Sequence, residues 1–127
     1  MTTRPQILLV DDDVSLLQAI AAILDLEGFE SVLCESAPSV VEFLRNLPIS
    51  LVIIDIFMPD QDGMETIRAI REQWPQLPII AMSGGWRSIN PETILETARA
   101  LGAQGALEKP FDRAALVEAV RRALNPD

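Results

Sequence analysis

Short, uninterrupted apolar runs constrain the fold of this chain more than any other feature of its sequence. The runs are ILLV at 7–10, LVII at 51–54 and PIIAM at 78–82. A strand with one face in water alternates apolar and polar residues, whereas a strand covered on both faces is apolar throughout. We therefore expect parallel strands in a sheet whose two faces are both buried.

The segments between these runs have helical periodicity. In 14–27 the apolar residues occupy about half of the helix circumference and leave Gln18 and Asp25 facing outward, and Gly28 suits the end of that helix. Further helices are predicted by capping and stop signals. They run from Ser36 to about Leu47, from Gly63 to Trp74, from the N-cap Asn90 to Gly102, and from the cap Asp112 onward.

Two weaker strands, FESVLC at 29–34 and ALEK at 106–109, complete a β-α order that repeats five times. Strict alternation favours an α/β fold with a doubly wound, five-stranded parallel sheet and right-handed crossovers. A length of 127 residues corresponds to about one domain. Because no linker separates two parts of the chain, we expect a single domain over residues 1–127.

Charge and cysteine content exclude several classes of function. A net charge of -9 argues against direct nucleic-acid binding, which requires clustered Lys and Arg to neutralise phosphates. The single Cys34 cannot form an internal disulfide, so a reducing compartment is the simplest expectation. The sequence contains neither a signal-peptide core nor an apolar stretch of ~20 residues. We therefore expect a cytoplasmic protein with no membrane contact.

Polar side chains follow the predicted strands at the points where these end. Asp11, Asp12 and Asp13 follow the first strand, Asp55 the third, Ser83 the fourth, and Lys109 lies at the end of the fifth. Ligands of open α/β sheets bind outside the carboxyl ends of the strands, near the point where the strand order reverses. We expect these side chains to form one site.

The residue types at this edge predict metal-assisted phosphoryl chemistry. Two carboxylates ~4 Å apart repel by about 4 kcal/mol at an effective dielectric near 20, so the acidic cluster requires a cation or raised pKa values. Mg²⁺ prefers such hard oxygen ligands and is often shared with a phosphoryl group. Asp55 would be the nucleophile, and Lys109 and the Ser83 hydroxyl would contact the transferred group, whose charge spreads over three oxygens.

Four motifs, ILLVDDD, LVIIDIFMPDQDG, PIIAMSGG and EKPF, occur in this order and at separations that resemble the response-regulator receiver domain over essentially the whole chain. The resemblance implies the CheY-like, flavodoxin-like (βα)5 fold. It also implies that Mg²⁺ is held by Asp11, Asp12, Asp55 and the backbone carbonyl of Phe57.

In the same family pattern, Asp55 matches the phosphoacceptor, Ser83 the hydroxyl residue that follows the phosphoryl group, and Lys109 the active-site lysine. Lys109 precedes Pro110, whose peptide bond is usually cis in this family. The implied donor is a histidine kinase or a histidine phosphotransfer protein. The phosphorylated domain would switch conformation to control an effector protein, with a homodimer as a further possibility, and would assist its own phosphorylation and dephosphorylation without being a metabolic enzyme.

Two features depart from the family pattern. Ala106 stands three residues before Lys109, where an aromatic side chain commonly takes part in the switch. The segment from Ser83 to Glu92 is somewhat long and contains Gly84, Gly85 and Trp86, so we expect its mobility to replace the aromatic.

Three other functions compete with this interpretation. A phosphatase of the haloacid-dehalogenase type would use Asp11 as nucleophile, since Asp11-x-Asp13 fits its motif, but would leave Asp55 without a task. A receiver fold that no longer accepts phosphate would act only as a docking module. A dinucleotide binder fits less well, because no Gly-rich turn follows the first strand.

Overall fold

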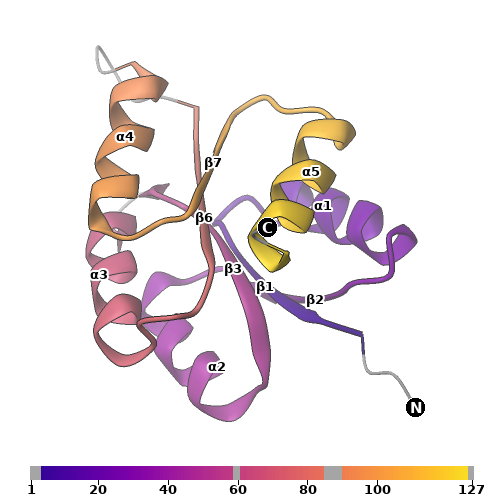
Figure 1. Ribbon diagram of the computed structural model, residues 1–127, viewed down its shortest axis with the longest axis horizontal. Coiled ribbons are helices and arrows are strands. Elements are labelled where there is room, and N and C mark those ends of the chain that lie inside the picture. The colour runs from indigo at the N-terminus through magenta and orange to yellow at the C-terminus, as the bar shows by residue number, and fades with distance from the viewer. Residues whose placement is uncertain (1–3, 59–60, 85–89, 126–127) are drawn as a thin grey trace.

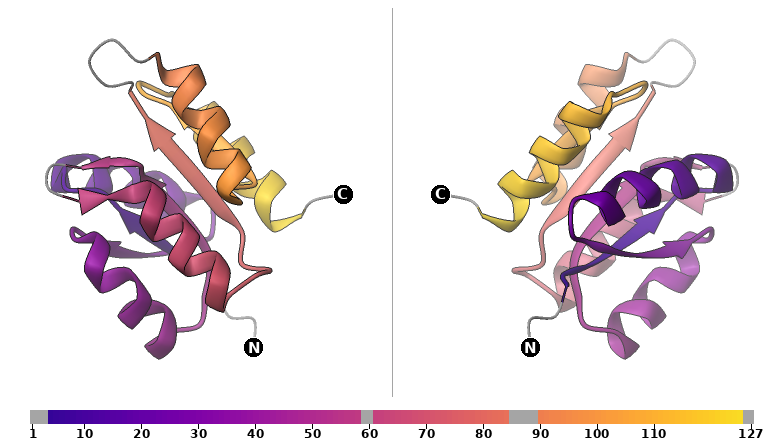
Figure 2. Two further views of the ribbon diagram at one scale, coloured as in Figure 1. Left: turned by 90° about the vertical axis from the view of Figure 1, so that its left-hand side faces the viewer. Right: turned by 90° about the vertical axis from the view of Figure 1, so that its right-hand side faces the viewer.

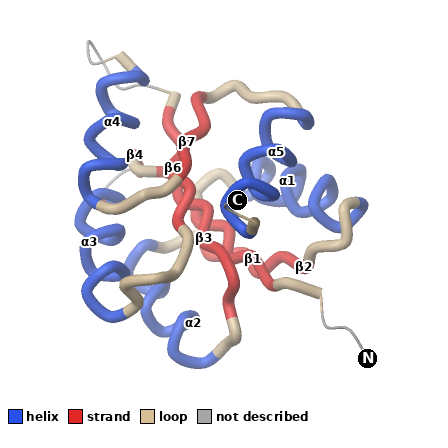
Figure 3. Tube along the Cα trace, viewed as in Figure 1, coloured by secondary structure: helices blue, strands red, loops and turns tan. Residues whose placement is uncertain are grey.

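The computed structural model describes residues 4–58, 61–84 and 90–125. Five strands form one parallel sheet in the order β2-β1-β3-β6-β7, which confirms the predicted doubly wound architecture. Figure 3 shows these strands in the middle of the molecule, between the helices. The strands are β1 Gln6–Val10, β2 Glu30–Cys34, β3 Ile49–Asp55, β6 Ile79–Ser83 and β7 Gly105–Glu108.

Helices cover both faces of the sheet. Helices α1 and α5 lie on one side, and α2, α3 and α4 lie on the other (Figures 1 and 2). The described helices are α1 Val14–Leu26, α2 Val40–Asn46, α3 Gly63–Gln73, α4 Pro91–Leu101 and α5 Arg113–Leu124. None of the helices described is long and apolar enough to span a bilayer.

The two helical layers explain why the strand sequences are apolar without interruption. Successive side chains of a strand point to opposite faces of the sheet. In β1, Ile7 and Leu9 therefore pack in the core beneath α1 and α5, whereas Leu8 and Val10 pack in the core beneath α2, α3 and α4. All four side chains are fully buried. Because helices cover both faces of β1 at these four positions, the usual alternation of apolar and polar residues is absent there.

Side chains cap three helices, two of them at the predicted residues Asn90 and Asp112. The side chains of Asp13, Asn90 and Asp112 each accept a hydrogen bond from the backbone N–H three residues later, at 3.1, 2.8 and 2.8 Å. These bonds satisfy N–H groups that have no partner within the helix. Gly28 and Gly102 follow α1 and α4 with φ of 92° and 122°, which confirms both as helix ends.

Two local structures differ from the predicted elements. The segment after Ser36 begins as a 3-10 helix, Ala37–Ser39, and the α-helix starts only at Val40. Tight 3-10 turns are common where an α-helix begins, and here Ser39 N–H bonds to the Ser36 carbonyl at 3.1 Å. The second difference is a short antiparallel pair, β4 (Phe57–Met58) and β5 (Gln61–Asp62), which is too short to leave a periodic pattern.

One arginine joins three segments at the amino end of the sheet, opposite the acidic residues. Nη1 of Arg71 in α3 donates to the carbonyls of Trp74, Pro75 and Leu77 at 2.9 to 3.0 Å. Its Nη2 donates to the Gly102 carbonyl at 2.6 Å and to Oε1 of Gln104 at 3.2 Å. Arg71 thereby ties the end of α3 to the turn between α4 and β7.

We expect Arg71→Met to lower the free energy of unfolding by about 3 kcal/mol, because several partly buried carbonyl groups would lose their donor at once. Urea denaturation followed by circular dichroism measures this change. The matched control is Arg68→Met on the same helix. Arg68 is exposed and lies 3.6 Å from Glu65, so its loss should cost less than about 0.5 kcal/mol. Equal losses in the two variants would contradict the assigned role of Arg71.

Candidate functional site

The acidic residues lie where the strand order reverses. From β1 the chain continues to β2 on one side, while β3 lies on the other, so the order reverses between β1 and β3, and ligands of such sheets bind beyond the carboxyl ends of these strands. Asp11 follows β1 and Asp55 is the last residue of β3. Both are buried, with exposed fractions of 1% and 6%. Two buried carboxylates on adjacent strands require compensating positive charge.

Lys109 supplies part of this charge. Its Nζ lies 2.8 Å from Oδ2 of Asp11 and 3.1 Å from Oδ2 of Asp55. The backbone N–H of Lys109 donates to the Ser83 carbonyl at 2.8 Å, which fixes the lysine beside the end of β6. Burial lowers the pKa of Lys109, but the hydrogen bonds and charges of the two carboxylates outweigh it, so the pKa is raised above its ordinary value. The group is therefore an ammonium.

Asp12 completes an acidic cluster that the single lysine does not neutralise. Carboxylate oxygens of Asp11, Asp12 and Asp55 all lie within 4.8 Å of one another. Burial, a hydrogen bond to Asp11 and the charge of Asp11 raise the pKa of Asp12 above its usual value. Oδ1 of Asp11 is oriented by the Asp13 backbone N–H at 3.0 Å. Three hard oxygen donors with an excess of negative charge fit a divalent cation such as Mg²⁺.

Ser83 is brought to the same edge of the sheet. It is fully buried and ends β6, one residue beyond Met82, which pairs with Asp55. The structure thus groups Asp11, Asp12, Asp55 and Lys109 directly, with Ser83 on the neighbouring strand.

Other predicted residues of the site are described only in part. Phe57 lies in β4, two residues after Asp55, and its carbonyl as a metal ligand stays a prediction. Gly85 and Trp86, expected to replace an aromatic switch, lie outside the described residues. Ala106 lies in β7 and packs against the core beneath α4. The Lys109–Pro110 peptide bond is cis, as the family pattern implied.

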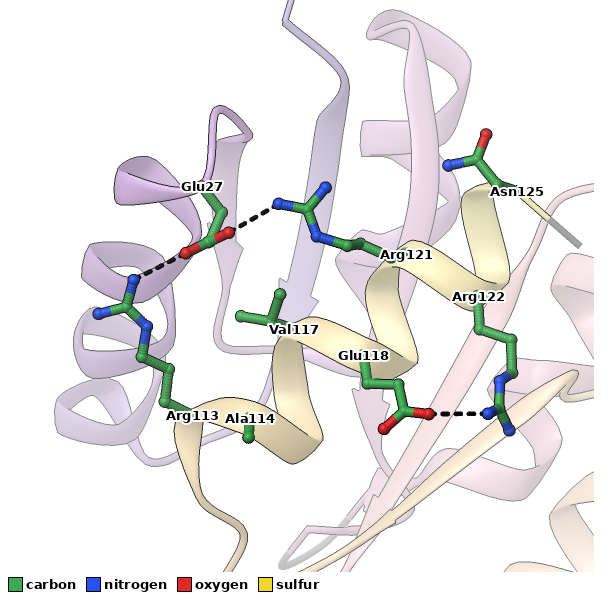
Figure 4. Close-up of a pocket in the computed structure, with 8 residues that line it drawn as sticks. All are labelled: Glu27, Arg113, Ala114, Val117, Glu118, Arg121, Arg122 and Asn125. Atoms are coloured by element: carbon green, nitrogen blue, oxygen red, sulfur yellow. Dashed lines mark hydrogen bonds and ion pairs between the residues drawn. The ribbon is translucent and has the colours of Figure 1, made fainter.

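A groove of about 950 Å³ lies away from the acidic cluster, along α5. Glu27, at the end of α1, accepts from Arg113 through Oε2 and from Arg121 through Oε1, both at 2.7 Å, and Arg122 pairs with Glu118 at 2.8 Å (Figure 4). This network was not predicted from the sequence. Its only sequence signal is the helical spacing of the arginines on α5. All three arginines have ion-pair partners within the protein. The residues that line the groove are Glu27, Arg113, Ala114, Val117, Glu118, Arg121, Arg122 and Asn125.

The two arginines lower the pKa of Glu27 below its ordinary value of 4.5. A lowered pKa in the folded state means that this interaction stabilises the protein above pH 4.5 and is lost as pH falls through the folded-state value. We therefore expect Glu27→Gln to be less stable than the wild type at neutral pH, with a difference that shrinks in acid. Thermal denaturation at a series of pH values measures it. In an Arg113→Met/Arg121→Met background the same substitution should show no such pH dependence.

Comparisons with known proteins agree with this arrangement. The family described as "Response regulator receiver domain" matches residues 7–121. The chain is 38% identical over 122 residues to the C4-dicarboxylate transport transcriptional regulatory protein DctD of Pseudomonas aeruginosa, covering 95% of this chain and 25% of DctD. It is 33% identical over 129 residues to the transcriptional regulatory protein FixJ of Bradyrhizobium diazoefficiens, covering 99% of this chain and 61% of FixJ.

The fold is likewise shared with a solved structure. The chemotaxis protein CheY4 of Vibrio cholerae superposes with a TM-score of 0.84 and 27% identity, over 96% of this chain and all of that one. The chain spans less than two thirds of the length of the curated relatives DctD and FixJ. The match of the family over nearly the whole sequence, with the acidic cluster and lysine in place, leads to one conclusion. The chain belongs to the response-regulator receiver domain family.

Proposed function

We propose that Asp55 accepts a phosphoryl group from the phosphohistidine of a histidine kinase or a histidine phosphotransfer protein. The observation that supports this most strongly is the position of the Asp55 carboxylate. It is buried at a strand end, 3.1 Å from the Lys109 ammonium and within 4.8 Å of the carboxylates of Asp11 and Asp12. Burying a charged carboxylate costs free energy, and ionisable groups held in such positions are often the ones that react.

In the proposed step, a carboxylate oxygen of Asp55 attacks the phosphorus atom. A P–O bond forms and the P–N bond to the histidine breaks. The imidazole, which carries a proton on its other ring nitrogen, takes the bonding electron pair and leaves as the neutral ring. Charge spreads over the three equatorial phosphoryl oxygens, so the protein contributes mainly positioning and charge stabilisation. The Lys109 ammonium, which pairs with the carboxylates beforehand, then contacts a phosphoryl oxygen.

The residues that would hold Mg²⁺ are Asp11, Asp12, Asp55 and the carbonyl of Phe57. When bound, the ion neutralises negative charge on the carboxylates and on the incoming phosphoryl group. The positions of the carboxylates support this assignment. Oxygens of Asp11, Asp12 and Asp55 lie within 4.8 Å of one another, and Lys109 neutralises only part of their charge.

Phosphorylation would then change the conformation at Ser83, at the end of β6, and so alter the surface that a partner reads. The names of the relatives DctD and FixJ describe transcriptional regulation. We propose that this receiver controls an effector, in the same polypeptide or in a separate one, within a two-component or phosphorelay pathway. Residues 1–127 would act as one receiver domain that assists its own phosphorylation and hydrolysis. Its acidic character supports a protein partner in the cytoplasm over direct contact with nucleic acid.

The alternatives have weaker support. A phosphatase with Asp11 as nucleophile would leave Asp55, which is buried at the end of β3 beside Lys109, without a role in the reaction. A docking module without phosphoryl transfer would have no use for three clustered carboxylates beside a lysine.

The test of the proposed function is the mass of the intact protein after incubation with acetyl phosphate. With Mg²⁺, the wild type should gain one phosphoryl group, and EDTA should prevent the gain. Absence of any gain in Mg²⁺, with the protein folded, would reject phosphoryl transfer and leave the docking module.

A further inference from the structure

Gly63, the first residue of α3, touches the backbone that carries Asp55. A Cβ atom at position 63 would lie 2.4 Å from Cα of Ile56, 2.8 Å from the carbonyl oxygen of Asp55 and 2.9 Å from the carbonyl carbon of Ile56. Real Cβ atoms essentially never approach other atoms within 3.0 Å. Gly63 does not adopt a left-handed backbone, so the need for glycine comes from this close approach and not from the turn itself.

The short strands β4 and β5 explain why the two backbones meet. Phe57 pairs with Asp62 in an antiparallel register, so Ile56 and Gly63 are the next residues outward on the two strands. Facing residues of an antiparallel pair have Cα atoms roughly 4.5 to 5.5 Å apart. The pair thus holds the start of α3 against the end of β3.

Neither the start of α3 nor the end of β3 can move freely to accommodate a Cβ atom at position 63. On the α3 side, Ile67 and Ile70 are fully buried in the core. On the β3 side, Ile56 is 2% exposed, and its backbone N–H donates to the Met82 carbonyl at 3.1 Å. Packed interiors transmit such an intrusion instead of absorbing it. A methyl group at position 63 would therefore displace the backbone of residues 55 and 56, next to Met82 and Ser83.

We propose that Gly63 is a positioning residue for phosphoryl transfer: the absence of its side chain lets the start of α3 fix the Asp55 backbone, so that the carboxylate faces Lys109 and the other two aspartates. This proposal rests on the proposed function of Asp55. It predicts that the Gly63→Ala variant folds, but that its Asp55 carboxylate is displaced from its position beside Lys109. A displacement of about 1 Å in a reacting group can cost as much as a hundredfold in rate.

The experiment compares Gly63→Ala with Ile70→Val, a second substitution in α3 that removes a buried methyl group about two turns from the contact. The rate of phosphorylation of each variant is measured in Mg²⁺ at a series of acetyl phosphate concentrations. The dependence on concentration gives the apparent kcat and the apparent KM for acetyl phosphate. We expect Gly63→Ala to lose at least about tenfold in kcat, whereas Ile70→Val stays within twofold of wild type. A rate for Gly63→Ala within twofold of wild type would overturn the proposal.

A second measurement does not depend on phosphorylation. Amide hydrogen exchange of the Ile56 N–H, without acetyl phosphate or Mg²⁺, should quicken in Gly63→Ala relative to Ile70→Val at equal global stability. Unchanged exchange at Ile56 would overturn the positioning role. If wild type is not phosphorylated but Ile56 exchanges faster in Gly63→Ala, the proposed function fails while the contact between residue 63 and the Asp55 backbone stands.

The glycine could instead be required for folding alone. Both variants are therefore also studied in trimethylamine N-oxide, which favours the folded state without touching the site. If Gly63→Ala remains unfolded even there, the proposal is overturned, because glycine is then needed by the fold as a whole. If the variant folds and its rate is still at least about tenfold lower, the positioning role is supported.

Discussion

Asp55→Asn is expected to gain no phosphoryl group from acetyl phosphate and Mg²⁺, under conditions in which the wild type is fully converted. An amide oxygen is a poor nucleophile, and the substitution leaves the shape of the buried site almost unchanged. Intact-protein mass spectrometry measures the gain. The matched control is Asp112→Asn, because Asp112 is also an acidic residue beyond a strand end, but it caps α5 instead of joining the cluster. Asparagine caps helices as well as aspartate does, so this control should be phosphorylated at the wild-type rate.

The same experiment separates the proposed function from the phosphatase. A mass gain that persists in Asp55→Asn but disappears in Asp11→Asn would make Asp11 the nucleophile and contradict our assignment. Loss of the gain in Asp55→Asn, together with slower phosphorylation of Asp12→Asn that added Mg²⁺ partly restores, would support Asp55 as acceptor and Asp12 as a metal ligand.

Lys109→Met is expected to slow phosphorylation by about a hundredfold to a thousandfold, the usual effect of removing one group that stabilises charge in the transition state. The amine lies 3.1 Å from Asp55, and methionine fills a similar volume without charge. The rate with acetyl phosphate, measured by quenching and mass analysis, tests this. Lys109→Arg retains the charge but not the compact shape of the ammonium, so its rate should fall between those of the wild type and the methionine variant.

The lysine also has a measurable effect on stability. Without it, Asp11 and Asp55 face each other across the site with no counter-ion, and we expect the free energy of unfolding in EDTA to fall by roughly 1 to 3 kcal/mol. Mg²⁺ should recover more stability in Lys109→Met than in the wild type, because the ion then replaces the missing charge. Urea denaturation with and without Mg²⁺ tests this, and equal effects of Mg²⁺ on both proteins would contradict it.

Much of the fold was predictable because its signals are local. Apolar runs marked the buried strands, and Asn90, Gly102 and Asp112 marked helix ends through hydrogen bonds to residues a few positions away. The grouping of Asp11, Asp55 and Lys109 was also predictable, since the carboxyl ends of parallel strands meet at one edge.

The features that were missed depend on contacts between distant segments. Arg71 bonds to the Gly102 carbonyl 31 residues away, and Glu27 pairs with Arg121 94 residues away. A charged residue on a helix has the same sequence pattern whether it faces water or binds a distant segment. The close approach of Gly63 to Ile56 likewise depends on a pair of two-residue strands, which leave no periodicity in the sequence.

The lysine that completes the site lies 98 residues after Asp11 and 54 after Asp55. During synthesis, the acidic residues therefore leave the ribosome long before their counter-charge, because Lys109 follows β7, which comes last in sequence among the described strands of the sheet. Under the proposed function, a histidine kinase that met a nascent chain before β7 was made would encounter aspartates without the lysine that lies beside Asp55. If Asp55 is the acceptor, as proposed, the domain would become competent for phosphorylation only after β7 has joined the sheet, so incomplete molecules would not consume phosphoryl groups.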